Sequence, residues 1–425
     1  MRIAMIALGS QGDVQPYIAL GKGLKAAGHA VRLLTHENYA ELVSAHGLEF
    51  CLMPGDVQEL IESQEMRDLL ARGNFLEITA RTAKEAQQAA VHWAQAGLVA
   101  CQDMDLLVAG VGGLNLAIAL AEKFAIPLVQ AYVFPFTPTT AFPGVLFPRL
   151  IARFGGWVNW LSHQLVRQIL WQGARTGDTL ARKQILNLPA PPLFGSYQST
   201  CLDRYPILYG FSPCVIPKPA DWHNTQVTGY WFLDAAPHWT PPAALLEFLE
   251  NGSPPVYVGF GSMGSRDPKE TAELVLSAIE RSQQRAILLA GWGGLRTENL
   301  PNHIYLVDSI PHAWLFPRVA AVVHHGGAGT TAAGLRAGVP TIVIPFFGDQ
   351  RFWGQRVASL GVGTEPIPRK QLTAQRLAQA IQTAVTDPTI RQRASNLGGK
   401  IQAEDGIANA VTTIQNISEL SRAVS

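Results

Sequence analysis

The chain has 425 residues, of which 48% are hydrophobic and 15% charged, and its formal net charge is +1. This length predicts two or more domains with large apolar cores, and the balanced charge gives no sign of a nucleic-acid partner. The apolar run at residues 3–8 is too short for a secretory signal, and the run at 106–121 is too short to span a membrane. The four cysteines form no CxxC pair, which is typical of a reduced cytoplasmic protein.

Short apolar runs alternate with helix-like segments through the first half of the chain. This β-α order predicts a doubly wound parallel sheet, whose ligands bind at the carboxyl ends of the strands. The strands are expected at residues 1–8, 30–35, 48–53, 106–109, 127–132 and 206–209, and the helices at 16–27, 39–46, 59–102 and 113–124.

The turn after the first strand carries Ser10 and Asp13 at such a carboxyl end. A carboxylate in this position can act as a general base for an incoming hydroxyl group. It can equally cap the helix that we expect to begin near Pro16. From position alone, the helix cap is the favoured interpretation of Asp13.

Asp103 and Asp105 form a DxD sequence like the metal-binding motif of one class of glycosyltransferases. They come before a predicted strand rather than after one. We therefore expect them to end a helix, and we predict no metal site in this protein.

The sequence becomes rich in proline and aromatic residues at 134–150, and a helix with three tryptophans is expected at 155–172. One interpretation is an apolar acceptor pocket that could also touch a membrane surface. The other is packing between elements of the domain, and an exposed apolar patch would distinguish the two. The residues predicted to bind the acceptor are Phe134, Phe136, Phe142 and Trp157.

A polar, proline-rich segment at 234–242 predicts a linker, after which the β-α alternation starts again. We expect one domain at residues 1–235, a second at 236–405, and a helix at 406–425 that packs back on the first. Within the second domain, strands are expected at 255–260, 285–290, 304–307, 320–323 and 341–344, and helices at 270–282, 372–385 and 387–399.

Residues 320–350 combine a strand, a glycine-rich turn, a helix expected at 331–337 and a further strand. Glycines let backbone N–H groups approach a ligand closely, and the start of a helix favours a phosphate. His324 and His325 can add donors, and Asp349 and Gln350 can bind sugar hydroxyls. The segment therefore predicts a nucleotide-sugar site that binds diphosphate without a metal, although a glycine turn alone also fits an ordinary βαβ unit.

Several motifs together resemble the sterol 3-beta-glucosyltransferases, within the nucleotide-sugar-dependent glycosyltransferases of family 1. The resemblance covers nearly the whole chain, and the last two motifs are the most specific. The motifs are GSQGDVQPYIALGKGLKAAGHAV, PFTPTTAFP, YGFSPCVIPKPADW, VYVGFGSM, AGWGGL, IPHAWLFPRVAAVVHHGGAGTTAAGLRAGVP and PFFGDQRFWGQRV.

The resemblance implies a GT-B fold, in which two Rossmann-like domains face each other across a cleft. It also implies an inverting transfer from a UDP-sugar, usually UDP-glucose, with Asp13 as the general base and no cofactor or metal. The residues implied to bind the donor are Ser10, Ser262, Trp292, Ile310, His324, His325, Gly327, Gly329, Thr330, Asp349 and Gln350.

Two positions depart from the pattern of plant relatives, which use a histidine base and a glutamate that binds the ribose. Here these positions correspond to Asp13 and Ala332, as in the sterol branch, so the ribose contact is unassigned. The long amino-terminal extension of fungal members is missing from this sequence, as we expect of a minimal, bacterial-type enzyme. A hopanoid, a carotenoid, a polyketide or another apolar alcohol therefore competes with a sterol as acceptor. A nucleotide-sugar epimerase and a non-catalytic accessory protein are the rival interpretations.

Overall fold

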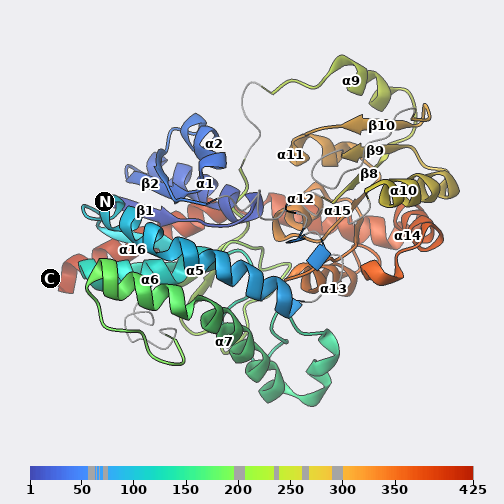
Figure 1. The fold of residues 1–425 in the computed structure, drawn as a ribbon. Coiled ribbons are helices and arrows are strands. Elements are labelled where there is room, and N and C mark those ends of the chain that lie inside the picture. The colour runs from blue at the N-terminus through green and yellow to red at the C-terminus, as the bar shows by residue number, and fades with distance from the viewer. Residues whose placement is uncertain are drawn as a thin grey trace. The chain divides into compact units, whose positions relative to one another are not determined.

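Two parallel sheets organise the chain in the computed structural model shown in Figure 1. The chain divides into two compact units, of which the first comprises Met1–Val57, Leu76–Leu233 and Glu404–Ser425, and the second comprises Gln58–Phe75 and Asp234–Ala403. The structure describes residues 1–55, 63, 65, 66, 68, 69, 75–195, 206–233, 239–260, 268–289 and 300–424.

The first unit contains a seven-stranded sheet in the order β3-β2-β1-β4-β5-β6-β7, and all of its neighbouring strands are parallel. The order reverses between β1 and β4, so the loops that follow these two strands diverge at the carboxyl edge. The strands are β1 (Arg2–Ile6), β2 (Ala30–Thr35), β3 (Glu49–Leu52), β4 (Leu106–Ala109), β5 (Leu128–Tyr132), β6 (Ile207–Tyr209) and β7 (Thr225–Val227).

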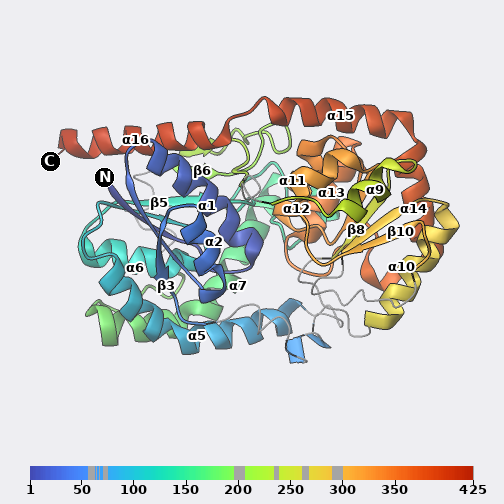
Figure 2. The same cartoon turned by 90° about the horizontal axis from the view of Figure 1, so that it is seen from above.

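The helices of the first unit connect these strands and cover the sheet (Figure 2). They are α1 (Gln11–Ala26), η1 (Glu37–Tyr39), α2 (Ala40–Ala45), α5 (Phe75–Ala100), η2 (Val111–Gly113), α6 (Leu114–Phe124), η3 (Arg149–Phe154), α7 (Gly156–Ala181), η4 (Arg182–Leu186) and α16 (Gly406–Val424).

The second unit contains a five-stranded parallel sheet in the order β10-β9-β8-β11-β12, which reverses between β8 and β11. Its strands are β8 (Val256–Gly259), β9 (Ala286–Leu289), β10 (Ile304–Val307), β11 (Ala321–His324) and β12 (Thr341–Val343). Its helices are α9 (Ala243–Glu250), α10 (Pro268–Ser282), α11 (His312–Leu315), η6 (Phe316–Arg318), α12 (Ala328–Ala337), α13 (Gln350–Leu360), η7 (Arg369–Gln371), α14 (Ala374–Thr386) and α15 (Pro388–Gln402).

The strands of the second unit are buried on both faces. Val256 and Val258 of β8 belong to one apolar cluster, while Tyr257 between them belongs to another. Because side chains alternate along a strand, the two clusters lie on opposite faces of the sheet. This explains why the strands appear in the sequence as continuous apolar runs. The prediction of doubly wound parallel sheets is confirmed.

The helix α16 belongs to the first unit and packs along α1, as Figure 2 shows. Gly23 of α1 permits this contact, since a Cβ atom there would lie 2.3 Å from Cγ2 of Ile407. Val411 and Ile414 complete the contact as members of the apolar core of this unit. The last helix is thus part of the core that supports β1.

Two helices begin earlier than the sequence predicted. The prediction that a helix begins near Pro16 was wrong, because α1 begins at Gln11 with Ser10 as its N-cap. The prediction that a helix begins at residue 331 was also wrong, because α12 begins at Ala328 with Gly327 as its N-cap. In both cases, residues of the preceding turn form the first helical turn.

The DxD sequence makes ion pairs on the surface. Asp103 pairs with Arg2 and Arg32, and Asp105 pairs with Arg2. Exposed pairs of this kind contribute little to stability, about 0–1 kcal/mol each. In the described part of the chain, no three His, Cys, Asp or Glu side chains are grouped as metal ligands, and no helix is long and apolar enough to cross a bilayer.

Candidate active site

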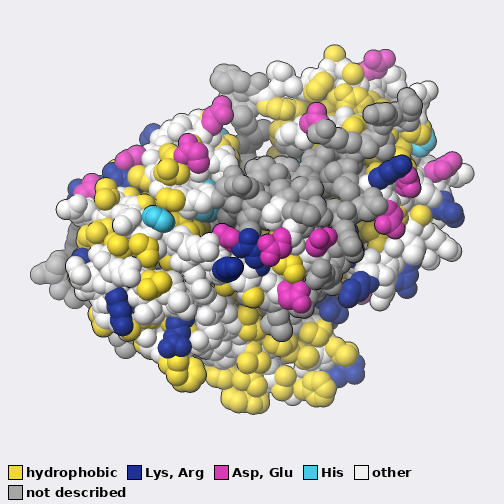
Figure 3. All heavy atoms as spheres, in the orientation of Figure 1, with side chains coloured by type: hydrophobic (Ala, Val, Ile, Leu, Met, Phe, Trp, Pro, Cys, Tyr) yellow, Lys and Arg dark blue, Asp and Glu magenta, His cyan; other side chains and the backbone are white. Residues whose placement is uncertain are grey.

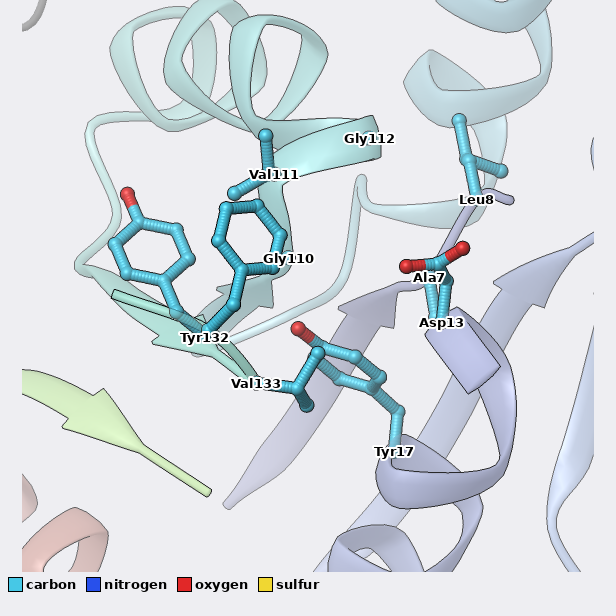
Figure 4. A pocket seen from close by; sticks show the side chains of 10 residues that line it. Ala7, Leu8, Asp13, Tyr17, Gly110, Val111, Gly112, Tyr132 and Val133 are labelled. Atoms are coloured by element: carbon cyan, nitrogen blue, oxygen red, sulfur yellow. The ribbon is translucent and has the colours of Figure 1, made fainter. Parts of the chain in front are cut away.

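A pocket lies at the carboxyl edge of the first sheet, where the strand order reverses between β1 and β4. Ligands of doubly wound sheets bind at such a reversal point. The pocket is lined, as Figure 4 shows, by Ala7, Leu8, Asp13, Tyr17, Gly110, Val111, Gly112, Tyr132, Val133 and Phe134.

Asp13 carries the one carboxylate among these ten lining residues. It is the third residue of α1, and its Oδ2 accepts hydrogen bonds from the amide and the hydroxyl of Ser10, each at 2.9 Å. No residue of the described chain hydrogen-bonds its other oxygen, Oδ1. One oxygen therefore anchors the carboxylate at the helix start, and the other can accept a proton.

The environment of Asp13 makes its carboxylate a stronger base than usual. Burial raises the pKa of the Asp13 carboxyl above its ordinary value, and the two hydrogen bonds from Ser10 oppose this rise. A base works best when its pKa approaches the working pH. The helix cap and the catalytic base are compatible roles, because the cap uses only Oδ2.

The backbone around the pocket requires glycine at three positions. Gly9 has a φ of +143°, and a Cβ atom there would lie 2.5 Å from Oδ2 of Asp13. A Cβ atom on Gly110 would lie 2.3 Å from the hydroxyl of Tyr17, and one on Gly112 would lie 2.2 Å from the carbonyl oxygen of Leu8. These glycines bring the loop after β4 against β1 and α1, which forms the pocket wall.

The wall residues Tyr17, Gly110 and Gly112 were not among the predicted site residues. The signal was present, because the sequence GVGG follows the strand at 106–109 as a second glycine-rich turn at a carboxyl edge. The hydroxyl of Tyr17 donates to the carbonyl oxygen of Ala131. Burial, together with the charge of Asp13, raises the pKa of Tyr17, so this side chain remains protonated at neutral pH.

Two of the predicted acceptor residues differ in their surroundings. Phe134 lines the pocket that contains Asp13. Phe136 is buried in the core, with its ring centroid 5.2 Å from that of Tyr132 and 5.5 Å from the guanidinium carbon of Arg167. Phe134 can therefore touch a ligand in this pocket directly, whereas Phe136 packs in the core beneath the loop that follows β5.

Phe142 and Trp157 lie away from this pocket lining. Phe142 is half-buried, with its ring centroid 5.8 Å from that of His163 and 6.2 Å from that of Trp222. Trp157 lies on the outside of α7 with 66% of its surface exposed. An exposed apolar patch was the feature expected to distinguish a contact surface from packing inside the domain. Trp157 provides such an exposed apolar side chain.

Asp221 holds the aromatic loop in place and was also missed. Its Oδ1 accepts from the hydroxyl of Thr139 at 2.7 Å, and its Oδ2 accepts from the amide and the hydroxyl of Thr140 at 2.7 and 2.9 Å. The partners are 82 and 81 residues apart along the chain, so no local pattern predicts this contact.

The glycine-rich turn of the second unit follows β11. His324 is fully buried, and its Nδ1 accepts from the amide of Gly326 at 2.9 Å, so the proton of the neutral ring lies on Nε2. No described residue accepts a hydrogen bond from Nε2. Burial, with His325 and His312 nearby, lowers the pKa of His324 well below its ordinary value. His324 therefore presents an uncharged, unpaired N–H donor.

The turn itself depends on glycine. Gly326 has a φ of +94°, and a Cβ atom there would lie 2.6 Å from Cγ1 of Val343. A Cβ atom on Gly327 would lie 2.5 Å from Nε2 of His325, whose pKa burial lowers to about 4. Gly329 and Thr330 are in the first turn of α12, where backbone N–H groups have no partner within the helix. The turn thus offers several donors suited to an anion.

Asp349 and Gln350 lie where β12 leads into α13. Oδ2 of Asp349 accepts from Nε1 of Trp353 at 2.8 Å. Oε1 of Gln350 accepts from the amides of Phe346 and Phe347 at 2.7 and 3.1 Å, so this oxygen shapes the preceding loop. The predicted pair is therefore held in place by its own neighbours.

The remaining predicted donor residues are only partly described. Ile310 follows β10 and is buried in an apolar cluster with Val307 and Leu315, which leaves its backbone as the group that could meet a base. Ser262 and Trp292 lie outside the described residues.

Comparison with known proteins identifies both halves of the chain. Residues 3–143 match the glycosyltransferase family 28 N-terminal domain, and residues 283–416 match the C-terminal domain of erythromycin biosynthesis protein CIII-like proteins. Sterol 3-beta-glucosyltransferase UGT80B1 of Arabidopsis thaliana is 38% identical over 97% of this chain and 67% of its own length. The chain belongs to the sterol 3-beta-glucosyltransferase family.

A fungal member of this family is as similar in sequence to this chain as the plant protein is. The sterol 3-beta-glucosyltransferase of Pichia angusta is 38% identical over 100% of this chain, which spans 34% of the length of that relative. Among solved structures, the glycosyltransferase SsfS6 of Streptomyces sp. SF2575, complexed with thymidine diphosphate, matches with a TM-score of 0.64 and 18% identity. That match covers 98% of this chain and 99% of SsfS6. The predictions of the family, of a GT-B fold and of a hexosyltransferase are confirmed.

Proposed function

We propose that this glycosyltransferase moves a hexose, most simply glucose from UDP-glucose, to the hydroxyl of an apolar acceptor such as a sterol, with inversion at the anomeric carbon. The observation that carries this proposal is the Asp13 carboxylate in a pocket at the sheet reversal, with a raised pKa and an Oδ1 that no described residue hydrogen-bonds. Among the other nine lining residues, none is charged, which suits an apolar acceptor. The names of the curated relatives support the sterol and the glucose.

In the proposed reaction, Oδ1 of Asp13 takes the proton of the acceptor hydroxyl. The acceptor oxygen attacks the anomeric carbon from the face opposite the diphosphate, and the bond from that carbon to the diphosphate oxygen breaks. The products are the β-linked glycoside and UDP. Help from a general base of this kind accelerates transfer by about 10²–10⁴-fold.

The leaving diphosphate gains negative charge as its bond breaks. Nε2–H of His324 and the first amides of α12, at Gly329 and Thr330, supply fixed donors for this charge. Donors that are already oriented stabilise a transition state without further reorganisation. Asp349 and Gln350 are proposed to bind the sugar hydroxyls, and the scheme uses no divalent ion.

A screen of candidate acceptors identifies the alcohol that receives the sugar. UDP-glucose is incubated with a panel of sterols, hopanoids, carotenoids, polyketides and phenolics, and the products are read by mass spectrometry. We expect a hexoside of a polycyclic or otherwise apolar alcohol, and NMR of its anomeric centre should show the β configuration. Retention of the α configuration, or full inactivation by EDTA that Mg²⁺ reverses, would contradict the proposed mechanism.

The two rival functions give different results in the same assay. An epimerase would convert the nucleotide sugar without any acceptor, and an accessory protein would neither transfer nor hydrolyse it. The presence of Asp13 in its pocket and of the Asp349–Gln350 pair argues against a non-catalytic role.

A further inference from the structure

A continuous set of large apolar side chains is exposed on η3 and on the first half of α7. We name it the Trp157 face, and Figure 3 shows apolar side chains gathered at the lower margin of the view, where α7 lies in Figure 1. Phe154 and Trp157 expose 68% and 66% of their surface. The complete face consists of Leu150, Phe154, Trp157, Leu161 and Leu165.

The first half of α7 exposes apolar side chains where a helix that faces water usually carries polar ones. Trp157, Leu161 and Leu165 recur every four residues, so they form one exposed stripe. The buried side of the same helix carries Asn159 and Ser162. Nδ2 of Asn159 donates to the carbonyl oxygen of Thr140 at 2.9 Å, and the hydroxyl of Ser162 accepts from the amide of Gly144 at 2.8 Å. These bonds fix the orientation of the helix.

The charged side chains of η3 and of α7 as far as Leu165 are all basic. Arg149 and Arg153 are exposed at its edge, on η3 itself. The sequence contains no aspartate or glutamate between Glu122 and Asp178, although it contains several basic residues there. An apolar face whose own helices carry arginines and no acidic residue as far as Leu165 complements an anionic lipid surface, in which phosphates lie above the acyl chains.

We propose that the Trp157 face docks the protein on the surface of an anionic lipid bilayer. Phe154, Leu161 and Leu165 enter the boundary between head groups and acyl chains, and Trp157, stacked on Trp160 at 5.0 Å, lies at the head-group level. Arg149 and Arg153 bind lipid phosphates. The proposed function is consistent with this docking, because an apolar acceptor dissolves in membranes. The docking itself is inferred from the exposed apolar side chains and the two arginines.

Vesicle flotation tests this proposal with the full chain. We expect the protein to float with phosphatidylcholine vesicles that contain phosphatidylglycerol. The variant F154Q/L161Q should bind vesicles at least about tenfold more weakly. In this variant, two side chains that would transfer from water into the lipid are polar, so the free energy gained by burying them is lost. Replacing Arg149 and Arg153 by glutamine should cost about fivefold for each arginine, and only on anionic vesicles. The matched control is Val99→Gln on α5, where Val99 is 75% exposed, and it should float like the wild type.

The outcomes separate this inference from the proposed function. If the wild type does not float, or if F154Q/L161Q floats equally well, the lipid surface is excluded. If light scattering instead shows a dimer that F154Q/L161Q converts to a monomer, the face binds a second copy and the proposal is wrong. Activity on a detergent-dispersed acceptor is measured in parallel. Transfer without flotation would leave the function intact, and flotation without any transfer would leave the lipid surface intact.

Discussion

The carboxylate of Asp13 and the N-cap Ser10 are joined by two hydrogen bonds to the same oxygen, Oδ2, each 2.9 Å long. The helix start therefore holds one oxygen and leaves Oδ1 for chemistry. Because each partner can be changed separately, the orientation of the base and its pKa can be tested independently.

Replacing Asp13 with asparagine should reduce kcat by at least about a hundredfold, because an amide cannot take the acceptor proton. Binding of UDP should not change, since the groups proposed to hold its diphosphate, at His324, Gly329 and Thr330, belong to the second unit. The measurements are steady-state turnover and calorimetric titration with UDP. A variant that turns over at the normal rate would remove Asp13 from the mechanism.

The same variant also tests the raised pKa through stability. Folding raises the pKa of Asp13, so its favourable contribution is fully present below the unfolded-state value of 3.8 and is lost as the pH rises through the folded value. Above the folded value the ionised carboxylate is therefore a cost, which asparagine removes. The Tm of Asp13→Asn should equal or exceed that of the wild type at pH 7. A clearly lower Tm would argue that the charge stabilises the folded protein.

Replacing Ser10 with alanine should shift the pH profile. The Ser10 hydroxyl donates to Oδ2 and thereby lowers the pKa of Asp13, so its removal lets burial raise that pKa further. The low-pH limb of kcat/KM, where the base becomes protonated, should move to higher pH. Ser10→Thr retains the hydroxyl and serves as the control. An unchanged limb would assign the profile to another group.

Replacing Trp353 with phenylalanine should weaken binding of the donor. Phenylalanine keeps an aromatic ring in this buried site but leaves a small cavity, and the hydrogen bond from Nε1 to Oδ2 of Asp349 is lost. KM for the UDP-sugar should rise roughly tenfold, as expected for one hydrogen bond to a charged group. Trp171→Phe in the first unit is the matched control, because Trp171 is equally buried and its Nε1 donates to the carbonyl oxygen of Leu193 at 2.9 Å. Equal effects of the two variants on KM would refute a specific role of Asp349.

Replacing Gly112 with alanine should destabilise the first unit. The new Cβ atom would lie 2.2 Å from the backbone oxygen of Leu8, which cannot move without shifting β1. We expect a loss of about 1–3 kcal/mol in the free energy of unfolding, together with loss of activity. Gly399→Ala in α15 meets no atom within 4 Å and should gain up to about 1 kcal/mol. Urea denaturation of both variants checks the prediction.

The sequence predicted the sheets well, because the strands of a doubly wound fold are buried on both sides and appear as uninterrupted apolar runs, such as Val256–Gly259. The stop of α12 at Gly338 was also predicted, since its φ of +70° is a conformation that glycine adopts readily. Helix starts were less predictable. Pro16 suggested a beginning that Ser10 in fact provides, because a capping residue can outweigh a proline within the following turns.

The site was predictable only where its residues are close in sequence. His324 and the turn that follows it could be found because strand, glycines and helix are consecutive. The contacts of Asp221 with Thr140 and of Tyr17 with Gly110 join distant segments, and only the tertiary structure brings them together. The roles of the proposed donor residues, including Ser262 and Trp292, stay predictions.

The packing of α16 on α1 has a consequence for synthesis on the ribosome. The first unit cannot bury the groove at Gly23 until Ile407, Val411 and Ile414 have left the exit tunnel, by which time the whole second unit has been translated. The segment that carries Asp13 is synthesised first, whereas α16, which packs on the helix that carries Asp13, is synthesised last. During translation we therefore expect the apolar side of α1 at Gly23 to stay exposed, and open to aggregation, until α16 is complete.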